Sequence, residues 1–325
     1  MRVKLIFMLF GSLSLLAALP LTEWCTERSG RKGHGLEDNH ALTARLKASP
    51  AGLVVDVGAF DGGDTIRFAT NGGHRVWTFE PAPTKVGPIK QRFIDEGIDS
   101  RVTLHNVALS NASGTASFRM YKMTYKPTQK KLYGKFERMM SKSVGSAFDT
   151  LNVDQKGVPR ADSEMVQVPV STLDSFDPDG RAEVLFMKVD AQGYDYRVLR
   201  GAEKMLRSQR IRGLVFEYCP HCMPTAHTPL GKTEAREALH WLTRVGYSCA
   251  PCNMNPWRFK LLAGGAVKHS IHSYVATFFK NALENVTDYF GFFDNFACEP
   301  TRLCEEAGRP DCKLWVHGKS VGPGR

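Results

Sequence analysis

One stretch in the first third of the chain constrains the fold more than any other. The apolar run Leu53–Val57 is broken only by Asp56 and is followed by two glycines, Gly58 and Gly62. A helix-like segment comes next, and a second apolar run then ends on Glu80, 24 residues after Asp56. This order of strand, glycine turn, helix, strand and acid is that of the first half of a nucleotide-type α/β site. The sequence therefore predicts an α/β fold with a ligand at the carboxyl ends of parallel strands.

The chemistry of this stretch favours one kind of ligand. Glycines let the backbone approach a nucleoside closely, and an acid at the end of the second strand can accept hydrogen bonds from both ribose hydroxyls. Dinucleotide sites usually carry G-x-G-x-x-G so that a helix N-terminus faces the pyrophosphate, whereas this chain has D-x-G-x-x-x-G with Phe60 and Asp61 between the glycines. An acid there suits a cationic, phosphate-free ligand, so we expect S-adenosylmethionine rather than a dinucleotide. A glycine turn without a ligand is the remaining alternative.

Four motifs, in the same order along the chain, are similar to those of the FkbM-type methyltransferases. They are Asp56–Ala59, Phe79–Pro81, Asn106–Ser110 and Phe186–Ala202. The resemblance covers about residues 53–279, which is most of the chain. The departure from the family pattern is a long basic insert, residues 121–164.

The resemblance implies a class I methyltransferase fold, which is a Rossmann-like, doubly wound, mostly parallel sheet. It also implies S-adenosylmethionine as the methyl donor and, usually, an oxygen atom as the acceptor. The periodicity of the chain agrees, because apolar runs alternate with helical segments joined by short links.

The apolar runs place the individual elements. The expected parallel strands are Leu53–Val57, Arg75–Glu80, Arg101–Val107, Val184–Val189 and Gly213–Tyr218. Thr115–Met120 and Val166–Ser171 are expected as added strands that flank the basic insert, and Tyr247–Ala250 and Ser273–Phe279 as strands that close the sheet with an antiparallel edge. The expected helices are Thr84–Glu96, Asp195–Ser208 and Lys232–Val245.

The donor site is predicted from the glycine loop and the strand ends. Asn106 can offer both a donor and an acceptor to an adenine ring. Asp61 and Thr65 are expected at the amino acid end of the donor, with Asp56 acting there through water. The predicted cofactor-binding residues are Asp56, Gly58, Ala59, Phe60, Asp61, Gly62, Thr65, Glu80, Pro81, Asn106 and Ala108. No metal ligand is predicted in this set.

Asp190 is the first candidate for a catalytic residue. It ends the fourth parallel strand, at the mouth of the expected site, where a carboxylate could remove the proton of an acceptor hydroxyl. The alternatives for Asp190 are a helix cap or a contact with the amino group of the donor. Asp195, Glu217 and His221 are weaker candidates, and Glu217 could instead pair with Lys188 inside the sheet.

The ends of the chain predict how it is organised. Two positive residues precede seventeen uncharged ones, Leu5–Leu21, so residues 1–22 are expected to be a signal anchor or a cleaved signal peptide. Residues 23–50 are then a stem or linker, residues 51–282 the methyltransferase domain, and residues 283–325 a cysteine-containing tail. With the positive flank in the cytosol, the catalytic domain would face the lumen.

The net charge of +10 is concentrated in the basic insert. From Arg119 to Lys142 there are eight lysines and arginines against one acid, Glu137. The insert is either a solvated surface segment or a loop that attracts acidic glycans or lipid headgroups. We expect no nucleic-acid partner, because the N-terminus directs the chain away from the cytosol and nucleus.

Eight cysteines support an oxidising compartment. Cys219, Cys222, Cys249 and Cys252 form two C-x-x-C pairs. They predict two disulfides between these loops, with a zinc site or a redox-active pair as alternatives. The remaining cysteines near the C-terminus, Cys298, Cys304 and Cys312, are expected to staple the tail.

These observations leave three classes of function open. The first is a lumenal S-adenosylmethionine-dependent O-methyltransferase that acts on a glycan or another small acceptor. It would be anchored in the Golgi or endoplasmic reticulum membrane, or else secreted. The second is a non-catalytic lumenal binding module on the same fold, and the third is a nicotinamide-dependent oxidoreductase. Two sequons, at Asn111 and Asn285, are further expected sites of glycosylation, with Asn111 the better placed.

Overall fold

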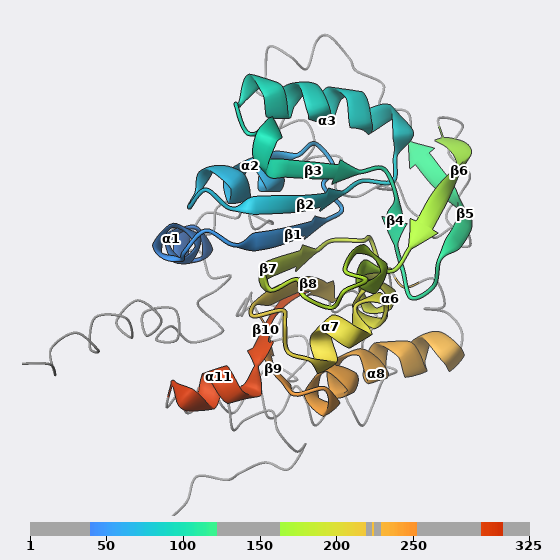
Figure 1. The fold of residues 1–325 in the computed structure, drawn as a ribbon. Helices are drawn as coiled ribbons and strands as arrows, with labels where there is room; N and C mark the ends of the chain where they lie inside the picture. Colours follow the sequence, from blue (N-terminus) through green and yellow to red (C-terminus); the bar gives the residue numbers. More distant parts are fainter. Residues whose placement is uncertain (1–39, 122–162, 219–222, 224–228, 252–293, 308–325) are drawn as a thin grey trace, which may run out of the picture.

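The computed structural model describes residues 40–121, 163–218, 223, 229–251 and 294–307. These residues form two sheets surrounded by helices (Figure 1). The larger sheet has seven strands in the order β3-β2-β1-β7-β8-β10-β9. Its strands are β1 (Leu53–Val57), β2 (Arg75–Phe79), β3 (Val102–His105), β7 (Val184–Val189), β8 (Leu214–Tyr218), β9 (Tyr247–Pro251) and β10 (Asp294–Pro300).

A second sheet of three strands has the order β4-β6-β5. Its strands are β4 (Ala108–Leu109), β5 (Gly114–Tyr121) and β6 (Ser163–Ser171). Figure 1 shows this small sheet beyond the carboxyl ends of β2 and β3. The helices are α1 (His40–Ala48), α2 (Gly63–Thr70), α3 (Pro83–Asp95), α6 (Asp195–Gly201), α7 (Glu203–Arg207), α8 (Pro229–Arg244) and α11 (Thr301–Glu306), with short 3-10 turns η3 (Asp99–Arg101) and η4 (Leu173–Phe176).

The sheet is doubly wound and mostly parallel, as the sequence predicted. Strands β3, β2, β1, β7 and β8 pair in parallel, and β10 runs antiparallel to both of its neighbours. The chain builds outward from β1 to β3 and then returns to place β7 on the other side of β1. Ligands of such sheets bind at this reversal of strand order, outside the carboxyl ends of the strands.

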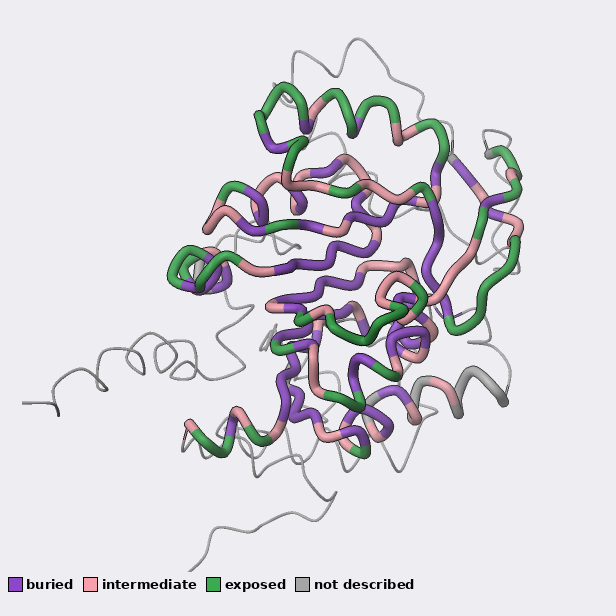
Figure 2. The backbone as a smooth tube through the Cα atoms, in the orientation of Figure 1, coloured by how far each residue is buried: buried purple, intermediate pink, exposed green. Residues whose placement is uncertain are grey.

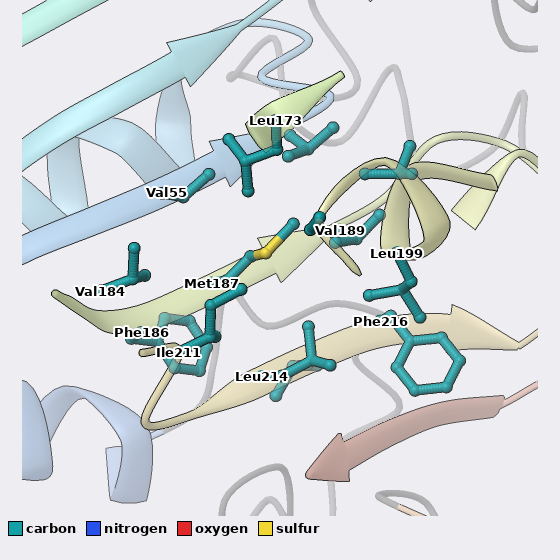
Figure 3. Close-up of a cluster of buried hydrophobic side chains, with 14 of the residues drawn as sticks. Val55, Leu173, Val184, Phe186, Met187, Val189, Leu199, Ile211, Leu214 and Phe216 are labelled. Atoms are coloured by element: carbon teal, nitrogen blue, oxygen red, sulfur yellow. The ribbon is translucent and has the colours of Figure 1, made fainter. Parts of the chain in front are cut away.

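The parallel strands form the core because both of their faces are covered. Every residue of β1 is buried, and β7 has one partly exposed residue. Figure 2 shows these two central strands mostly in the colour of buried residues. The side chains of β1, β7 and β8 pack together with Leu173 of η4 and Leu199 of α6 (Figure 3). A strand buried on both faces reads as a nearly continuous apolar run. The runs of β1 and β7 are each broken by one charged residue, Asp56 and Lys188, and the sequence located both strands with their observed bounds.

The predicted helix Asp195–Ser208 is divided into α6 and α7. The division falls at Ala202, just after Gly201, whose position would bring a Cβ within 2.0 Å of the carbonyl oxygen of Ser110. The carboxylate of Asp174 accepts hydrogen bonds from the backbone N–H groups of Lys204 (2.8 Å) and Met205 (3.1 Å). This cap from η4 starts a new helix. No local sequence pattern reveals it, because Asp174 is thirty residues away.

The strand that reverses the sheet lies further along the chain than predicted. Ser273–Phe279, expected to close the sheet, lies outside the described residues, and β10 takes the place between β8 and β9. Phe296 and Ala297 of β10 are fully buried. Residues 294–300 are therefore part of the sheet and not of a separate tail. The expectation of a strand at Ser273–Phe279 stays a prediction.

The predicted stem also ends earlier than residue 50. Leu42 and Leu46 of α1 are 2% exposed and belong to the main core. The buried ring of His74 accepts a hydrogen bond from Gly52 N–H at Nδ1 (3.2 Å), and its Nε2 therefore donates to Leu46 O (3.0 Å). Burial lowers the pKa of His74, which favours this neutral form.

A disulfide joins the two strands at the edge of the large sheet. Cys249 of β9 and Cys298 of β10 are register partners and are bonded to each other. The predicted pairing of Cys249 with the first C-x-x-C loop is therefore wrong, and so is a four-thiolate zinc site, because Cys249 is already bonded. Cys304 is also disulfide-bonded, and Cys219, Cys222, Cys252 and Cys312 lie outside the described residues.

We expect this disulfide to contribute strongly to stability. It closes a separation of 49 residues, which corresponds to about 4 kcal/mol of chain entropy removed from the unfolded state. Replacing both cysteines by alanine should lower the free energy of unfolding by roughly 2–4 kcal/mol, as measured by urea denaturation at fixed pH. A double variant as stable as the native protein would show that strand pairing alone holds this edge.

The N-terminal segment 1–39 and the basic insert 122–162 lie outside the described residues. Within the residues that are described, no helix is both long and apolar enough to cross a bilayer.

Candidate cofactor and catalytic site

The candidate site lies where the chain reverses its strand order, at the carboxyl ends of β1, β2 and β7. The loop of residues 58–62, here called the glycine loop, follows β1 directly. Gly58 N–H and Ala59 N–H both donate to the carbonyl of Phe79 at the end of β2, at 3.0 and 3.1 Å. The loop is therefore fixed to the strand end that carries the acid predicted to bind ribose.

Gly58 is required by an approach of two backbones. Its φ is +80°, and a Cβ at this position would lie 1.9 Å from the carbonyl oxygen of Asp190. The glycine therefore allows the ends of β1 and β7 to come together. Gly62 has φ +83°, and its Cβ would lie 2.8 Å from the ring of Phe93 on α3. Both predicted glycines thus have a packing reason in the fold, while their contact with a cofactor stays a prediction.

Glu80 organises the glycine loop through both of its oxygens. Oε2 accepts from Phe60 N–H (2.8 Å), and Oε1 accepts from Ala82 N–H (2.9 Å). Phe60 has φ +58°, a conformation that a non-glycine residue adopts only when its surroundings hold it. The Nζ of Lys85 lies 3.9 Å from Oε1 and 4.5 Å from the centre of the Phe60 ring. A carboxylate oxygen can accept more than one hydrogen bond, and the contact of Glu80 with ribose hydroxyls stays a prediction.

Asn106 follows β3 and binds the backbone at Glu80. Its Nδ2 donates to the backbone carbonyls of Glu80 (2.8 Å) and Pro81 (3.0 Å), so the amide nitrogen fixes the strand end. Ala108 is buried in the small sheet, where it pairs with Val170 of β6. The contact of Asn106 with adenine, and that of Ala108 with the donor, stay predictions.

His105 is a packed strand residue, as expected. Its ring stacks on Phe79 with centroids 4.8 Å apart, and Phe176 of η4 meets both rings edge-on. Burial lowers the pKa of His105.

Asp61 faces helix α3. Its Oδ2 accepts from Arg92 Nη1 (2.8 Å), and its Oδ1 accepts from Gly63 N–H (2.9 Å) at the start of α2. Both carboxylate oxygens therefore have structural partners. The predicted contact of Asp61 with the amino acid end of a donor is not tested by this geometry.

Asp56 lies beneath the glycine loop, fully buried. Its Oδ2 accepts from the hydroxyl of Thr65 on α2 (2.6 Å), and that hydroxyl is 3.1 Å from the hydroxyl of Thr78 on β2. Its Oδ1 lies 3.6 Å from Lys188 Nζ. Burial raises the pKa of Asp56 and the positive charge of Lys188 opposes that shift. Asp56 and Thr65 thus support the loop from within.

Lys188 connects more parts of the site than the sequence analysis predicted, where it was named only as a possible partner of Glu217. Its Nζ donates to the carbonyl of Gly58 (3.3 Å) and pairs with Asp64 on α2 (3.1 Å), with Asp56, and with Asp190 (3.8 Å). The ion pairs of Lys188 are therefore with these three aspartates, and not with Glu217, the alternative that the sequence offered. A lysine inside an otherwise apolar strand run was the available signal, because such a charge needs buried partners.

Asp190 ends β7, and its side chain is 39% exposed. Its Oδ1 accepts from Gln192 Nε2 (2.6 Å), so one oxygen is oriented while the carboxylate stays accessible. Asp195 is buried and accepts the backbone N–H groups of Ala191 (3.2 Å) and Gly193 (3.1 Å), closing the turn between β7 and α6. Asp195 is therefore a turn residue, whereas Asp190 faces outward. His221 lies outside the described residues.

Glu217 completes an acidic group at the ends of β7 and β8. Burial, together with the negative charges of Asp190 and Asp195, raises the pKa of Glu217 well above its ordinary value. Burial and the charge of Asp190 raise the pKa of Asp195 to about 7. Carboxyl groups of this kind hold a proton near neutral pH, which is the range in which general acid–base groups work.

The raised pKa of Asp195 predicts a pH dependence of stability. An aspartate has a pKa of 3.8 in the unfolded chain and of about 7 here, so the folded state binds this proton more tightly. The contribution of Asp195 to stability is complete below pH 4 and is lost as the pH rises toward 7. The melting temperature of the native protein minus that of Asp195→Asn should therefore fall between pH 4 and 7. A difference that is constant with pH would contradict the raised pKa.

The residues present fit a cationic nucleoside. The carboxylates of Asp56, Asp64 and Asp190 all pair with Lys188, whose Nζ donates to the carbonyl of Gly58. Another carboxylate, that of Glu80, lies at the end of β2. Asp64 lies in the first turn of α2, where a pyrophosphate would otherwise meet the helix N-terminus. This set favours the sulfonium donor that the sequence predicted over a dinucleotide. Among the described residues, no cluster of three or more histidine, cysteine or acidic side chains could hold a metal ion.

Comparison with known proteins gives one family. Residues 56–249, more than half of the chain, match the family model of the methyltransferase FkbM domain. A comparison with curated proteins found no match.

Solved structures of methyltransferases are similar at low identity. Methyltransferase FkbM from Methylobacillus flagellatus is 14% identical with a TM-score of 0.38, over 63% of this chain and 41% of that one. The chain therefore spans about two fifths of the length of that protein. An O-methyltransferase from Bacillus cereus in complex with SAH is 10% identical (TM-score 0.37, 89% and 90% covered). An SAM-dependent methyltransferase from Geobacter sulfurreducens in complex with S-adenosyl-L-homocysteine is 13% identical (TM-score 0.34, 87% and 99% covered).

Proposed function

This chain belongs to the FkbM methyltransferase family, and we propose that it methylates a hydroxyl oxygen of a small-molecule or glycan acceptor in the secretory pathway. S-adenosylmethionine is the cofactor of the family, and it supplies the methyl group when bound. The doubly wound sheet with β10 reversed between β8 and β9 is a class I methyltransferase fold. The family assignment displaces the nicotinamide oxidoreductase that the sequence left open.

The accessible carboxylate of Asp190 is the observation that supports oxygen as the acceptor. It lies at the carboxyl end of β7, directly against the glycine loop, because its backbone carbonyl is in contact with Gly58. A hydroxyl must lose its proton as it accepts a methyl group, and a carboxylate within hydrogen-bond reach assists that loss. Asp190 accepts from Gln192 at Oδ1. Its Oδ2 lies 3.8 Å from Lys188 Nζ and can also accept a hydrogen bond from a hydroxyl. We therefore assign proton removal to Asp190.

The described part of the chain also supports an oxidising compartment. The disulfide between Cys249 and Cys298 is of a kind that persists in secreted and lumenal proteins and is rare in the cytosol. The uncharged N-terminal segment fits a signal anchor or signal peptide, which would place the catalytic domain in the lumen of the endoplasmic reticulum or Golgi, or outside the cell. There, Asn111, which lies in an exposed turn between β4 and β5, would be open to glycosylation.

A two-step experiment tests the proposal. The oxidised full-length protein is first titrated with S-adenosylmethionine and with its demethylated product in a calorimeter. It is then incubated with donor labelled in the methyl group and a panel of neutral and acidic glycans, and the label is located by mass spectrometry. We expect micromolar donor binding and label on a hydroxyl oxygen.

Asp190→Asn separates the parts of the proposal. It should bind the donor within a few-fold of the native protein but transfer methyl about 100-fold more slowly, because general base catalysis typically contributes that much. Label on nitrogen, or transfer unchanged in Asp190→Asn, would contradict the assignment of oxygen or of the base. Donor binding without transfer to any hydroxyl acceptor would favour the non-catalytic binding module.

A further inference from the structure

We propose that Lys188 is a positioning residue that sets the donor-binding glycine loop and the Asp190 carboxylate at a fixed separation. One ammonium group joins them, because Nζ contacts the carbonyl of Gly58 at 3.3 Å and a carboxylate oxygen of Asp190 at 3.8 Å. The proposal rests on the cofactor of the family and not on the identity of the acceptor.

Lys188 is built into a polar row across one part of the sheet. Register pairing places Thr78 of β2 beside Asp56 of β1, and Asp56 beside Lys188 of β7. The Lys188 side chain is 9% exposed, so its charge is satisfied by protein atoms. Those atoms come from three elements: β1 through Asp56, α2 through Asp64, and the strand end through Asp190.

The surrounding charges keep Lys188 protonated. The negative charges of Asp64, Asp56 and Asp190 raise its pKa and outweigh the burial that lowers it. On α2, Arg67 pairs with the other oxygen of Asp64 (3.0 Å), and on β8 Glu217 is influenced by Lys188 without contacting it. The ammonium is therefore a permanent cation, and its lysine stem projects from the middle of a rigid strand.

Stability alone does not account for this arrangement. A buried ion pair gains little over apolar side chains of similar volume, because its desolvation offsets the attraction. The hydrogen bond from Lys188 to the Gly58 carbonyl differs from its ion pairs with the three aspartates. It fixes a backbone atom of the glycine loop, and it neutralises no charge because the carbonyl is uncharged. Asp56 and Asp190 each have another hydrogen-bond partner, Thr65 and Gln192. What Lys188 adds is the link between them and the loop.

The test separates positioning from stability with two variants. Lys188→Met keeps the stem and removes the charge, which leaves Asp56 buried without its cation. Lys188→Met combined with Asp56→Asn removes both charges, while the asparagine oxygen can still accept from Thr65. Melting temperature, calorimetric donor affinity, and hydrogen exchange of the backbone amides of residues 57–63 are measured for each. The exchange measurement needs no donor.

We expect Lys188→Met to lose both stability and donor affinity. The double variant should recover most of the lost melting temperature. Its dissociation constant for S-adenosylmethionine should stay raised about tenfold or more, since a hydrogen bond from a charged group is worth about that much. Its amides at residues 57–63 should exchange faster. Lys188→Arg should bind the donor more tightly than Lys188→Met but less tightly than the native protein. It keeps the positive charge, but on a planar guanidinium instead of a compact ammonium.

Arg210 provides a matched control at the other end of these strands, because its carbonyl accepts from the N–H of Val184, the first residue of β7. It pairs with Asp177 and donates to Ala182 O (3.0 Å), and both charged side chains are largely buried. Arg210→Met should lower the melting temperature without changing donor affinity or the exchange of residues 57–63.

Two results would overturn the proposal. One is a double variant that recovers donor affinity and loop protection together with stability, because Lys188 would then only balance charge. The other is a folded Lys188→Met variant with native affinity and exchange. If the native protein itself fails to bind the donor, the cofactor assignment fails, and the exchange measurement still decides whether Lys188 orders the loop.

Discussion

Donor binding is expected to fall about 100-fold when Glu80 is replaced by alanine. The carboxylate accepts backbone hydrogen bonds from Phe60 at 2.8 Å and from Ala82 at 2.9 Å, and it is the acid that the sequence predicts to accept the ribose hydroxyls. Its removal takes away both a ligand contact and the two bonds that shape the glycine loop. Hydrogen bonds to a charged group are worth about 1.5–3 kcal/mol each, and about 2.7 kcal/mol corresponds to a 100-fold change in affinity.

A calorimetric titration with S-adenosylmethionine, alongside a melting curve, measures this effect. Glu80→Gln is the sharper variant, because its amide nitrogen cannot accept the hydrogen bond that one carboxylate oxygen now receives. It should weaken binding by at least about tenfold while leaving the shape of the side chain unchanged. Glu96→Ala, on the exposed end of α3, is the control and should bind normally. Native affinity in Glu80→Ala would place the donor elsewhere on the molecule.

Gly58→Ala is expected to be the most destabilising single substitution at the site. The added Cβ would lie 1.9 Å from the carbonyl oxygen of Asp190, and the backbone has φ +80°. Neither atom belongs to a flexible side chain, so β1 and β7 would have to separate at their carboxyl ends. Strain of this kind together with an incompatible backbone conformation should cost at least about 3 kcal/mol. Donor binding should be lost with it.

Gly52→Ala is the matched control for Gly58→Ala, because it lies just before the same strand. A Cβ there would make ordinary contacts with Leu185, the nearest at 3.4 Å, so the melting temperature should change little. Urea denaturation of both variants, with donor titration of the folded fraction, checks the pair. Equal stabilities for the two variants would show that the ends of β1 and β7 can move apart freely.

The parallel strands and the acid at the end of β2 could be read from the sequence. Strands buried on both faces, such as Leu53–Val57 and Val184–Val189, appear as apolar runs. Glu80 directly follows another such run, that of β2. The antiparallel strand Asp294–Pro300 could not be placed in this way. Its apolar run is short and resembles many others in the chain, and only its pairing with β8 and β9 selects it.

The sequence by itself located the residues that are predicted to surround the donor, because Asp56 lies in an apolar run and the glycine loop, Glu80 and Asp190 directly follow such runs. Only the tertiary structure decided what each of them does. Gly58 proved to serve a contact with Asp190, 132 positions away, and Lys188 proved to hold three acids from separate elements. Local patterns encode a strand and the residue at its end. Which side chains share a buried charge depends on how distant strands are paired, and that is set by the packing of the whole sheet.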